Sequence, residues 1–518
     1  MNKDWNMSNI HKINLTGIKI LFLGYGGVAK CVLNYFDYYF NYDINKVYII
    51  DKYEKTLYGP VQNKIPKSNI LFEKIQCENF DYIVLDKLKF KKGDLIIDLT
   101  FASNTYYFVK KCLEMDINYI NTSIEDGNDD FGGSSIAFQQ FTIENIYDEI
   151  KSRKKISCNV LLECGQNPGL IQHYIIFALN EMNKLKNPNS SDVWDVSELR
   201  SVISDYKIGT ILSSEIDCVT KTKDVFDKQS NRIYNTWSVS GLLGEGIDNT
   251  ELTYSKKNKY VKPKIPNYMV DKEKSIIFSK CIKANTKINS KSNQMPYDIM
   301  FLNDAGINCT LNSICPGLDC DGNIEFQNFS GRLIHHGEMF DMAKEFGPDA
   351  PFMSYCYKIN KYAEYSIKKY MSTSAYANPN DLSMKINSIN EDFVVYDNYN
   401  VKPENRIVGW DSVGCTIFCG KKNIESIYWC GSILSSNDLN VMEMFTPTIV
   451  QVAAGVLGGI SYIMEPSNKN IGMIFPNQIH TPYILSKSVP LLGKFFFTEI
   501  PVKDFNKPHI KFGIDKLI

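Results

Sequence analysis

The stretch IKILFLGYGGVA, residues 18–29, decides the fold of this chain of 518 residues. An apolar run, Ile18 to Leu23, predicts a β-strand that enters the glycine turn Gly24-Tyr25-Gly26-Gly27-Val28-Ala29 and continues into a helix. In such a turn the first glycine allows the sharp bend, the second lets the backbone approach a pyrophosphate, and the small Ala29 lets the helix pack near the strand. The N–H groups and positive dipole end of the helix would then face the phosphates. The stretch therefore predicts a dinucleotide site.

A second strand, Val47 to Ile50, ends in Asp51, where a carboxylate accepts hydrogen bonds from the adenosine ribose hydroxyls. Asp51 would repel a 2'-phosphate, so we expect NAD rather than NADP, with Lys52 and Lys55 close by as opposing charges. The alternative is a Rossmann-like unit without a nucleotide, because glycines also mark ordinary strand-to-helix turns.

Length and composition bound the class of protein. A chain of 518 residues exceeds the size of one hydrophobic core, so two or more domains are expected. The net charge of -1 gives no general attraction to nucleic acid or an anionic membrane. The 14 cysteines form no C-x-x-C pair and the 6 histidines show no metal spacing, which indicates reduced thiols and no metal site. The polar start, Met1 to Thr16, lacks a secretory pattern, so we expect a cytoplasmic protein.

Further runs predict the α/β class, a Rossmann-like doubly wound parallel sheet. Expected strands are Asp81 to Leu85, Asp94 to Leu99 and Asn118 to Ile120, with a helix at Tyr106 to Met115. Ligands bind beyond the carboxyl ends of such strands, which singles out the loops Thr100 to Ser103 and Thr122 to Glu125. Plain capping residues are the alternative for either loop.

From about residue 190 longer extended segments replace the alternation of strands and helices. This change predicts a second, α+β domain for substrate binding and dimerisation. We expect an NAD-binding domain at 1–165, the α+β domain at 166–440 and a helical segment at 441–518 that returns to the cofactor domain. The apolar run Ile449 to Met464 is shorter than a membrane span and predicts a buried helix packed through small residues. Residues 251–300 are rich in Lys and Asn and predict a solvated excursion, whereas Cys415 to Cys419 and Ser426 to Leu434 predict a hairpin.

Several motifs resemble those of the bacterial-type homospermidine synthases, relatives of saccharopine dehydrogenase. They are Asn167-Pro168-Gly169-Leu170 with His173, Glu215, the run Asn235-Thr236-Trp237-Ser238-Val239 with Gly241 and Glu245, and His336 with Glu338. The resemblance touches most of the chain. It is weakest in the N-terminal tail and at 180–210, 251–300 and 350–400.

The resemblance implies roles for these residues. The Asn167-Pro168 loop would approach the nicotinamide end of NAD. The catalytic set would be Glu215, Trp237, Glu245 and His336, and a diamine would also meet Glu125, Asn167 and Glu338. With Asn167 and Pro168 added to the residues predicted from the glycine turn and the strand ends, the cofactor set is Gly24, Gly26, Gly27, Ala29, Asp51, Thr100, Ser103, Asn167 and Pro168.

The chemistry of amines favours such residues independently. An aromatic face attracts an ammonium by about 0.5 to 2 kcal/mol, and a carboxylate pairs with it better away from water. One amine must lose a proton before hydride leaves its α-carbon, and a carboxylate can take that proton. Without the resemblance, Trp237 would be a core residue and Glu245 a surface acid. The run His335-His336-Gly337-Glu338 has too few ligands for zinc.

Together the motifs predict an NAD-dependent homospermidine synthase, a redox-neutral aminobutyl transferase that acts on putrescine and related polyamines as a homodimer. NAD would oxidise one putrescine, a second amine would displace ammonia, and the retained NADH would reduce the Schiff base. One rival is a saccharopine-type or carboxynorspermidine-type dehydrogenase, which would need an arginine for a substrate carboxylate. Arg232 and Arg332 are the nearest candidates. The other rival is a nucleotide-binding protein without catalysis.

Overall fold

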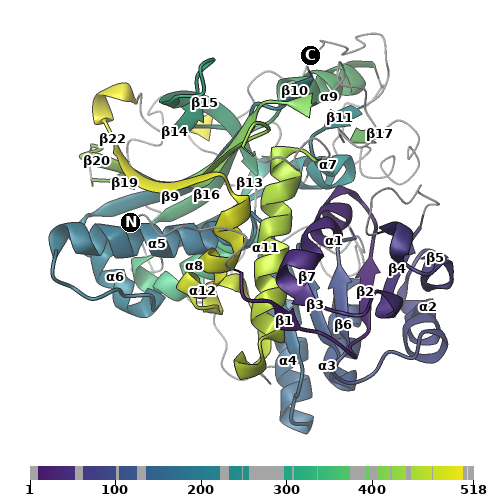
Figure 1. Cartoon of the computed structure of the whole chain (residues 1–518). Helices are drawn as coiled ribbons and strands as arrows, with labels where there is room; N and C mark the ends of the chain where they lie inside the picture. The colour runs from purple at the N-terminus through teal and green to yellow at the C-terminus, as the bar shows by residue number, and fades with distance from the viewer. Residues whose placement is uncertain are drawn as a thin grey trace. The chain divides into compact units, whose positions relative to one another are not determined.

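The computed structural model folds into two compact units (Figure 1). The first comprises 1–173 and 449–492, and the second comprises 174–448 and 493–518. The sequence-based expectation is domains at 1–165, 166–440 and 441–518. The structure describes residues 10–52, 62–100, 104–124, 136–221, 233–247, 249–255, 297–305, 309–334, 336–373, 393–395, 407–420, 423–438, 445–468, 471–505 and 510–511.

The first unit is built on a parallel seven-stranded sheet with the order β21-β8-β7-β6-β2-β4-β5. Its strands are β2 (Ile20–Leu23), β4 (Val47–Asp51), β5 (Ile70–Phe72), β6 (Leu95–Asp98), β7 (Asn118–Asn121), β8 (Asn159–Leu161) and β21 (Gly472–Ile474). A small pair, β1 (Ile13–Asn14) with β3 (Phe40–Asn41), lies outside it. Because β2 lies between β4 and β6, strand order reverses beside the glycine turn, where doubly wound sheets bind ligands. The predicted α/β fold class is confirmed.

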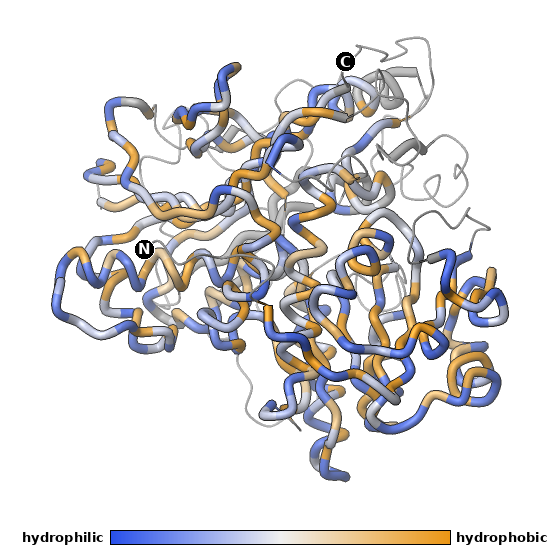
Figure 2. Tube along the Cα trace, in the orientation of Figure 1, coloured by the Kyte–Doolittle hydropathy of each residue, from blue (hydrophilic) through white to orange (hydrophobic). Residues whose placement is uncertain are grey.

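Helices cover this sheet. They are α1 (Gly27–Tyr39), α2 (Cys77–Phe80), α3 (Thr105–Met115), α4 (Ile136–Arg153), the start of α5 (Leu170–Lys186), α11 (Pro447–Met464) and α12 (Thr481–Ser488). Every residue of β2 and β6 is buried, as expected for parallel strands covered on both faces. Figure 2 shows apolar segments along the strands and polar residues in the connecting turns.

One predicted strand is wrong. The segment Asp81–Lys87 is a π-helical continuation of α2 and not a strand. A capping box at Gln76 starts that helix, and its buried side chains, Phe80, Ile83 and Val84, lie three and four positions apart. An apolar run this short fits a strand or a helix equally well, and the cap decides in favour of the helix.

The helix α11 is packed through small residues, as predicted. A Cβ on Gly455 would lie 2.0 Å from the carbonyl oxygen of Gly165, and one on Gly459 would lie 2.6 Å from the Cys164 sulfur. Among the described residues, α11 is the one helix that is long and apolar enough to cross a membrane, and 83% of its apolar window is buried inside the protein. This packing accounts for its apolar sequence.

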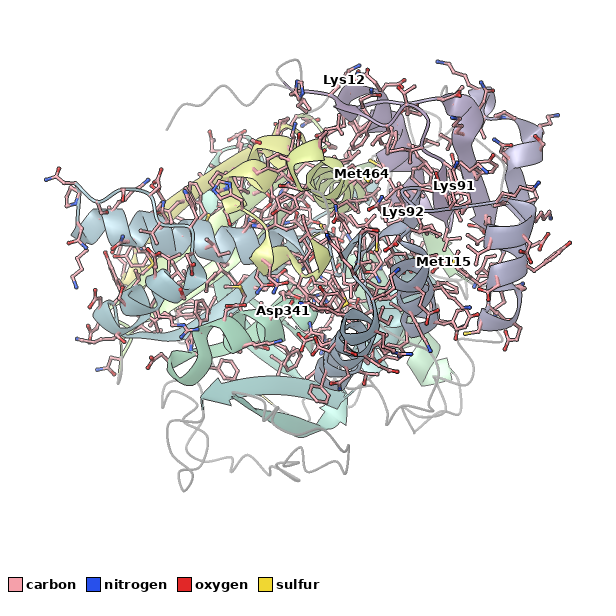
Figure 3. All side chains as sticks on the ribbon, turned by 90° about the horizontal axis from the view of Figure 1, so that it is seen from below. Lys12, Lys91, Lys92, Met115, Asp341 and Met464 are labelled. Atoms are coloured by element: carbon pink, nitrogen blue, oxygen red, sulfur yellow. The ribbon has the colours of Figure 1, made fainter. Side chains whose placement is uncertain are left out.

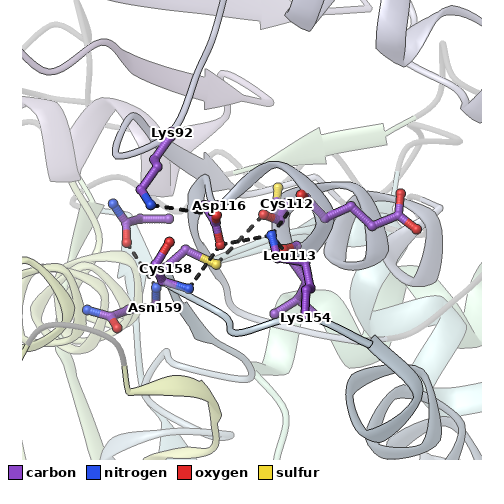
Figure 4. Close-up of polar contacts among 10 residues, drawn as sticks. Lys92, Cys112, Leu113, Asp116, Lys154, Cys158 and Asn159 are labelled. Carbon is purple, nitrogen blue, oxygen red and sulfur yellow. Dashed lines mark hydrogen bonds and ion pairs between the residues drawn. The ribbon is translucent and has the colours of Figure 1, made fainter. Parts of the chain in front are cut away.

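Ion pairs join the amino-terminal edge of the parallel sheet. Asp116, which ends α3 in a left-handed conformation, lies 3.8 Å from Lys92 Nζ and 3.1 Å from Lys154 Nζ and accepts the Ser157 N–H at 2.9 Å (Figure 4). Burial opposes ionisation of Asp116, but the Ser157 and Lys154 hydrogen bonds lower its pKa. Met115, the residue before Asp116, lies in the same region of the first unit as Lys92 (Figure 3). This edge is fixed by side chains, while the glycine turn lies at the opposite, carboxyl edge.

The second unit is built on a ten-stranded mixed sheet whose main path is β22-β20-β19-β9-β16-β15-β14-β23. Its strands are β9 (Ile208–Asp217), β12 (Asn249–Ser255), β13 (Tyr297–Ala305), β14 (Thr310–Leu318), β15 (Ile324–Ile334), β16 (Phe352–Lys358), β19 (Trp410–Cys419), β20 (Ser426–Ser435), β22 (Lys494–Ile500) and β23 (Ile510–Lys511). Small pairs are formed by β10 (Thr220–Lys221) with β18 (Ile407–Val408) and by β11 (Ile233–Asn235) with β17 (Phe393–Val395). The helices are the rest of α5, α6 (Val196–Asp205), α7 (Val239–Ile247), α8 (Gly337–Phe346) and α9 (Lys361–Thr373).

The strands of this sheet include two segments for which the sequence makes a specific prediction. The predicted hairpin is confirmed as β19 and β20, which pair antiparallel from Trp410 with Ser435 to Cys419 with Ser426. The solvated excursion expected at 251–300 has a strand at each end, because β12 and β13 pair with each other there. The polar composition that suggested solvent is compatible with strands when pairing satisfies the backbone. The central part of the excursion lies outside the described residues.

Candidate functional site

The glycine turn of the first unit has the form that a dinucleotide needs. Gly24 adopts a positive φ of 78°, and a Cβ there would lie 2.9 Å from the Leu99 carbonyl oxygen, so the bend excludes a side chain. A Cβ on Gly26 would meet nothing within 4 Å, so the backbone is open to a ligand on that side. Among the residues that the structure describes, no side chain caps the start of α1. The turn can therefore present backbone N–H groups to a pyrophosphate.

Asp51 is fixed beside this turn. It ends β4, is buried, and its Oδ2 accepts the Tyr25 N–H at 2.6 Å. This bond holds the carboxylate at the end of the strand, where the ribose of a dinucleotide is bound in Rossmann folds. The predicted cofactor residues Gly24, Gly26 and Asp51 are thus brought together.

Two other predicted cofactor residues are close-packed. A Cβ on Gly27 would lie 2.7 Å from Ile449 Cδ1, so this glycine admits α11 against α1. Ala29 is fully buried in α1, as expected for close packing of helix and strand. Neither position needs a nucleotide to explain its small side chain.

The loop after β6 reaches the same turn. Thr100 Cγ2 would be 3.0 Å from a Cβ on Gly24, and the Thr100 N–H donates to Asp98 Oδ1 at 3.0 Å. Asp98 is buried and also accepts the Tyr119 hydroxyl at 2.7 Å. The sequence interpretation missed Asp98, although, like Asp51, it is an acid that ends a buried strand. Ser103 lies outside the described residues.

The Asn167-Pro168 loop follows β8 and is tightly folded. The Pro168 carbonyl oxygen accepts the Gly165 N–H at 2.8 Å, and Gly169 has a φ of 134° with no room for a Cβ. Because it follows β8, the loop lies at the carboxyl edge of the sheet, and its approach to the nicotinamide stays a prediction. His173 has a different role, because it is buried, its Nδ1 lies 3.0 Å from Thr481 Oγ1, and burial lowers its pKa to about 3. It is a neutral histidine that ties α5 to α12.

The amine motifs of the second unit converge on one face of the mixed sheet. Glu215 and Asp217 are two residues apart on β9, so their side chains point to the same face of the sheet. Across the parallel ladder Glu215 is the register partner of Tyr357, and across the antiparallel ladder Asp217 is the partner of Asp411. All five side chains, with Tyr355 two residues before Tyr357, are buried.

His336 joins two further carboxylates to this face. Its Nε2 lies 3.4 Å from Glu245 Oε2 and its Nδ1 lies 3.3 Å from Glu338 Oε2, the latter as an ion-pair contact and not an aligned hydrogen bond. Burial would lower the pKa of His336, but the charges of Glu338 and Glu245 raise it well above its ordinary value. The imidazole ring also lies against Tyr355, whose hydroxyl donates to Glu215 Oε2 at 2.6 Å. The predicted Glu215, Glu245, His336 and Glu338 are therefore one cluster.

Trp237 is held at the border of this cluster. Its Nε1–H donates to the Tyr357 hydroxyl at 3.1 Å, and its ring is half-buried. A Cβ on Gly241 would lie 2.7 Å from Trp237 Cζ3, so the glycine four residues later makes room for the indole. The spacing of the Asn-Thr-Trp-Ser-Val-x-Gly run thus has a packing reason.

The two remaining acids of the face are bound by threonines. Asp217 accepts the Thr236 hydroxyl and Asp411 accepts the Thr448 hydroxyl. Burial raises the pKa of Asp217 to about 6. Burial, followed by the negative charges of Glu215 and Asp217, raises the pKa of Asp411 well above its ordinary value. The face therefore holds mutually repelling carboxylates that a cationic ligand would stabilise.

The arginine considered for a substrate carboxylate is paired with an acid of the protein itself. Glu125, His335 and Arg232 lie outside the described residues. Arg332 is described, and its guanidinium pairs with Glu364 at 2.7 Å. It is therefore occupied by an acid of α9 and is not presented to a substrate carboxylate.

A cavity of about 650 Å³ lies elsewhere on the first unit. It is lined by Tyr147, Lys151, Ser152, Arg153, Lys154, Lys155, Ile156, Ile471 and Gly472. Ile156 precedes β8 and Ile471 precedes β21, so the cavity lies at the amino edge of the sheet. It is not the dinucleotide site.

Comparison with known proteins identifies relatives of both units. Residues 20–155 match the saccharopine dehydrogenase NADP binding domain family. Over 508 residues, the chain is 21% identical to a homospermidine synthase of Mesorhizobium japonicum, a match that covers 93% of this chain and 90% of that protein. A homospermidine synthase of Blastochloris viridis is 19% identical over 495 residues, covering 92% of this chain and 89% of that protein.

A solved structure shares the fold. The homospermidine synthase of Legionella pneumophila, crystallised in complex with NAD, superposes with a TM-score of 0.69 at 19% identity. The match covers 94% of this chain and 92% of that chain. These similarities confirm the predicted resemblance across both units.

Proposed function

We propose that this protein is an NAD-dependent homospermidine synthase. It makes homospermidine from two putrescines, or from putrescine and spermidine, with release of ammonia or diaminopropane. The observation that carries the proposal is the meeting of Glu215, Glu245, Glu338 and His336 on one buried face with Trp237 at its border. Similarity to homospermidine synthases over nine-tenths of the chain supports it.

The first unit would hold the cofactor. The open side of Gly26 and the start of α1 fit the pyrophosphate, and Asp51 fits the adenosine ribose. The carboxylate of Asp51 disfavours the 2'-phosphate of NADP, which is why NAD is proposed. The chemistry that bound NAD supplies is reversible hydride acceptance.

The second unit would bind the diamine. A protonated amine beside Glu215 gains a charge-assisted hydrogen bond in a buried setting. The indole of Trp237 offers a face for the other cationic end. Neutralisation of the acid face by a dication would also relieve the repulsion among Glu215, Asp217 and Asp411.

Proton movements fit the same residues. A buried carboxylate with a raised pKa, such as Asp217, can accept a proton near neutral pH. His336 is held as an imidazolium between two acids, so its Nε2–H, 3.4 Å from Glu245 Oε2, can supply a proton to departing ammonia. Two putrescines would give one homospermidine and one ammonia with no net oxidation.

The rival dehydrogenase has less support. A saccharopine-type substrate carries carboxylates that call for a free guanidinium. Arg332 is paired with Glu364, and the described site face is acidic. A dication fits this charge pattern better than an anion.

We also propose that the protein acts in the cytoplasm as a homodimer. The described cysteines are free thiols, which suits a reducing compartment. The strand β22 forms an edge of the mixed sheet, where a strand of a second copy could pair, and the half-buried Phe497 lies on this edge strand. Light scattering tests this surface by comparing the molar mass of Phe497→Asp with that of the wild type. Equal masses would remove the support for this surface.

The test of function uses the purified protein with putrescine and NAD at a concentration far below that of the product formed. Homospermidine and ammonia should accumulate together, while free NADH should stay low. Release of NADH in proportion to amine consumed would favour a dehydrogenase. NAD binding without any product would favour a binding protein.

A further inference from the structure

Tyr355 contacts both halves of the acid cluster, although no motif marks it. It lies on β16 between the Glu215 strand and β15, and it is buried. Its hydroxyl donates to Glu215 Oε2 at 2.6 Å. Its ring centroid lies 4.3 Å from the His336 ring and 5.7 Å from the stacked Tyr357 ring. One side chain therefore joins the carboxylate of β9 to the imidazolium beside α8.

The hydroxyl of Tyr355 is a fixed donor. Burial, followed by the charge of Glu215, raises the pKa of Tyr355 well above its ordinary value, so the phenol keeps its proton. A hydrogen bond to the ionised form of an acid favours that form. The acids near Glu215 oppose its ionised form: Asp217 lies on its own strand, Asp411 on β19, and Glu245 acts on the same tyrosine. Its register partner Tyr357 is neutral, and the His336 imidazolium lies against the Tyr355 ring.

The ring of Tyr355 acts on His336. An imidazolium beside an aromatic ring is attracted by the ring's quadrupole. The ring also restricts the plane of the imidazole while Glu245 and Glu338 hold its two nitrogens. The same residue thus fixes an acceptor for amines and a donor for ammonia.

We propose that Tyr355 is a positioning residue that fixes Glu215 with its hydroxyl and the His336 imidazole with its ring. This inference rests on the proposed function, because it assigns the two groups to amine binding and ammonia release. The hydroxyl and the ring have separate effects, so substitutions can distinguish them.

The test uses Tyr355→Phe, which removes the hydroxyl and keeps the ring. Loss of one hydrogen bond to a charged group should disfavour the ionised form of Glu215 by roughly tenfold. Amine binding requires ionised Glu215, so it should be lost at a higher pH in the variant than in the wild type. The acid limb of kcat/KM for putrescine should therefore move up by about one pH unit. At a pH within this limb, kcat/KM should fall about tenfold.

Tyr206→Phe is the matched control. Tyr206 lies in the same unit and donates its hydroxyl to the Met182 carbonyl oxygen at 2.7 Å. It should keep the wild-type pH profile, and thermal unfolding should show both variants folded. A pH profile of Tyr355→Phe that coincides with that of the wild type would overturn the inference.

Putrescine binding without NAD separates this inference from the proposed function. Calorimetry across pH should show the same upward shift of the acid limb in Tyr355→Phe, without any turnover. If the wild type binds putrescine but forms no homospermidine, the proposed function fails, and this binding shift still decides the role of Tyr355. Equal binding curves for both proteins would refute that role.

Discussion

Replacing Glu245 by Gln tests how the cluster sets the charge of His336. The change keeps the size of the side chain and removes the charge 3.4 Å from His336 Nε2. Glu245 is only 14% exposed, so water screens the pair weakly. A hydrogen bond between charged groups contributes about 1.5 to 3 kcal/mol, which corresponds to a fall of roughly one to two units in the His336 pKa. The charge of Glu338 remains and keeps part of the upward shift.

The assay follows the imidazole directly. NMR titration of histidine-labelled protein reports each of the 6 histidines, and His336→Gln identifies the relevant signal. The kcat/KM for putrescine should fall by roughly ten- to a hundredfold if the proton donor is lost. Glu425→Gln makes the same chemical change in an exposed pair with Lys207 and should leave both readings unchanged. An unaltered His336 titration in folded Glu245→Gln would refute the account of this cluster.

Three other substitutions test the remaining parts of the site. Gly26→Val should abolish NAD binding by filling the open side of the turn, while Asp51→Ala should weaken NAD more than NADP; normal titrations of both would remove the turn from the cofactor site. Trp237→Phe should retain more kcat/KM than Trp237→Ala, because a ring remains although the bond to the Tyr357 hydroxyl is lost, and equal activities would exclude an aromatic role. Asp217→Asn should stabilise the protein at pH 8 by on the order of 3 kcal/mol and have no effect below about pH 4. The raised pKa of about 6 destabilises the folded protein only at a pH where the carboxyl of the unfolded chain is ionised, and a difference in unfolding free energy that does not change with pH would contradict this.

The local parts of the fold could be predicted because one short stretch contains their cause. The apolar strand, the bend at Gly24 and the acid that ends β4 are a few residues apart, and each has a steric or electrostatic reason. The segment Asp81–Lys87 was misassigned because the decisive signal, the cap at Gln76, lies before the apolar run. Gly27 looks like a nucleotide glycine, but its contact with Ile449 depends on a helix at the other end of the chain.

The site could be predicted only where a family motif marks it. Glu215, Trp237, Glu245 and His336 were found through the resemblance. Tyr355 was missed because its partner Glu215 is 140 residues away, and only the parallel register of β9 and β16 brings them together. Asp411 was visible as a polar residue beside Trp410, but its pairing with Asp217 depends on a second non-local ladder. Such pairings follow from the whole sheet and not from periodicity within one segment.

The fate of carbon-bound hydrogen tests the central claim most directly. Putrescine deuterated at both nitrogen-bearing carbons would be supplied with the purified protein, catalytic NAD and an excess of unlabelled NADH in solution. If hydride is taken and returned within one turnover, mass spectrometry should show homospermidine that retains every carbon-bound deuterium. Product that has lost one deuterium per molecule would mean reduction by free NADH, and it would contradict a redox-neutral synthase.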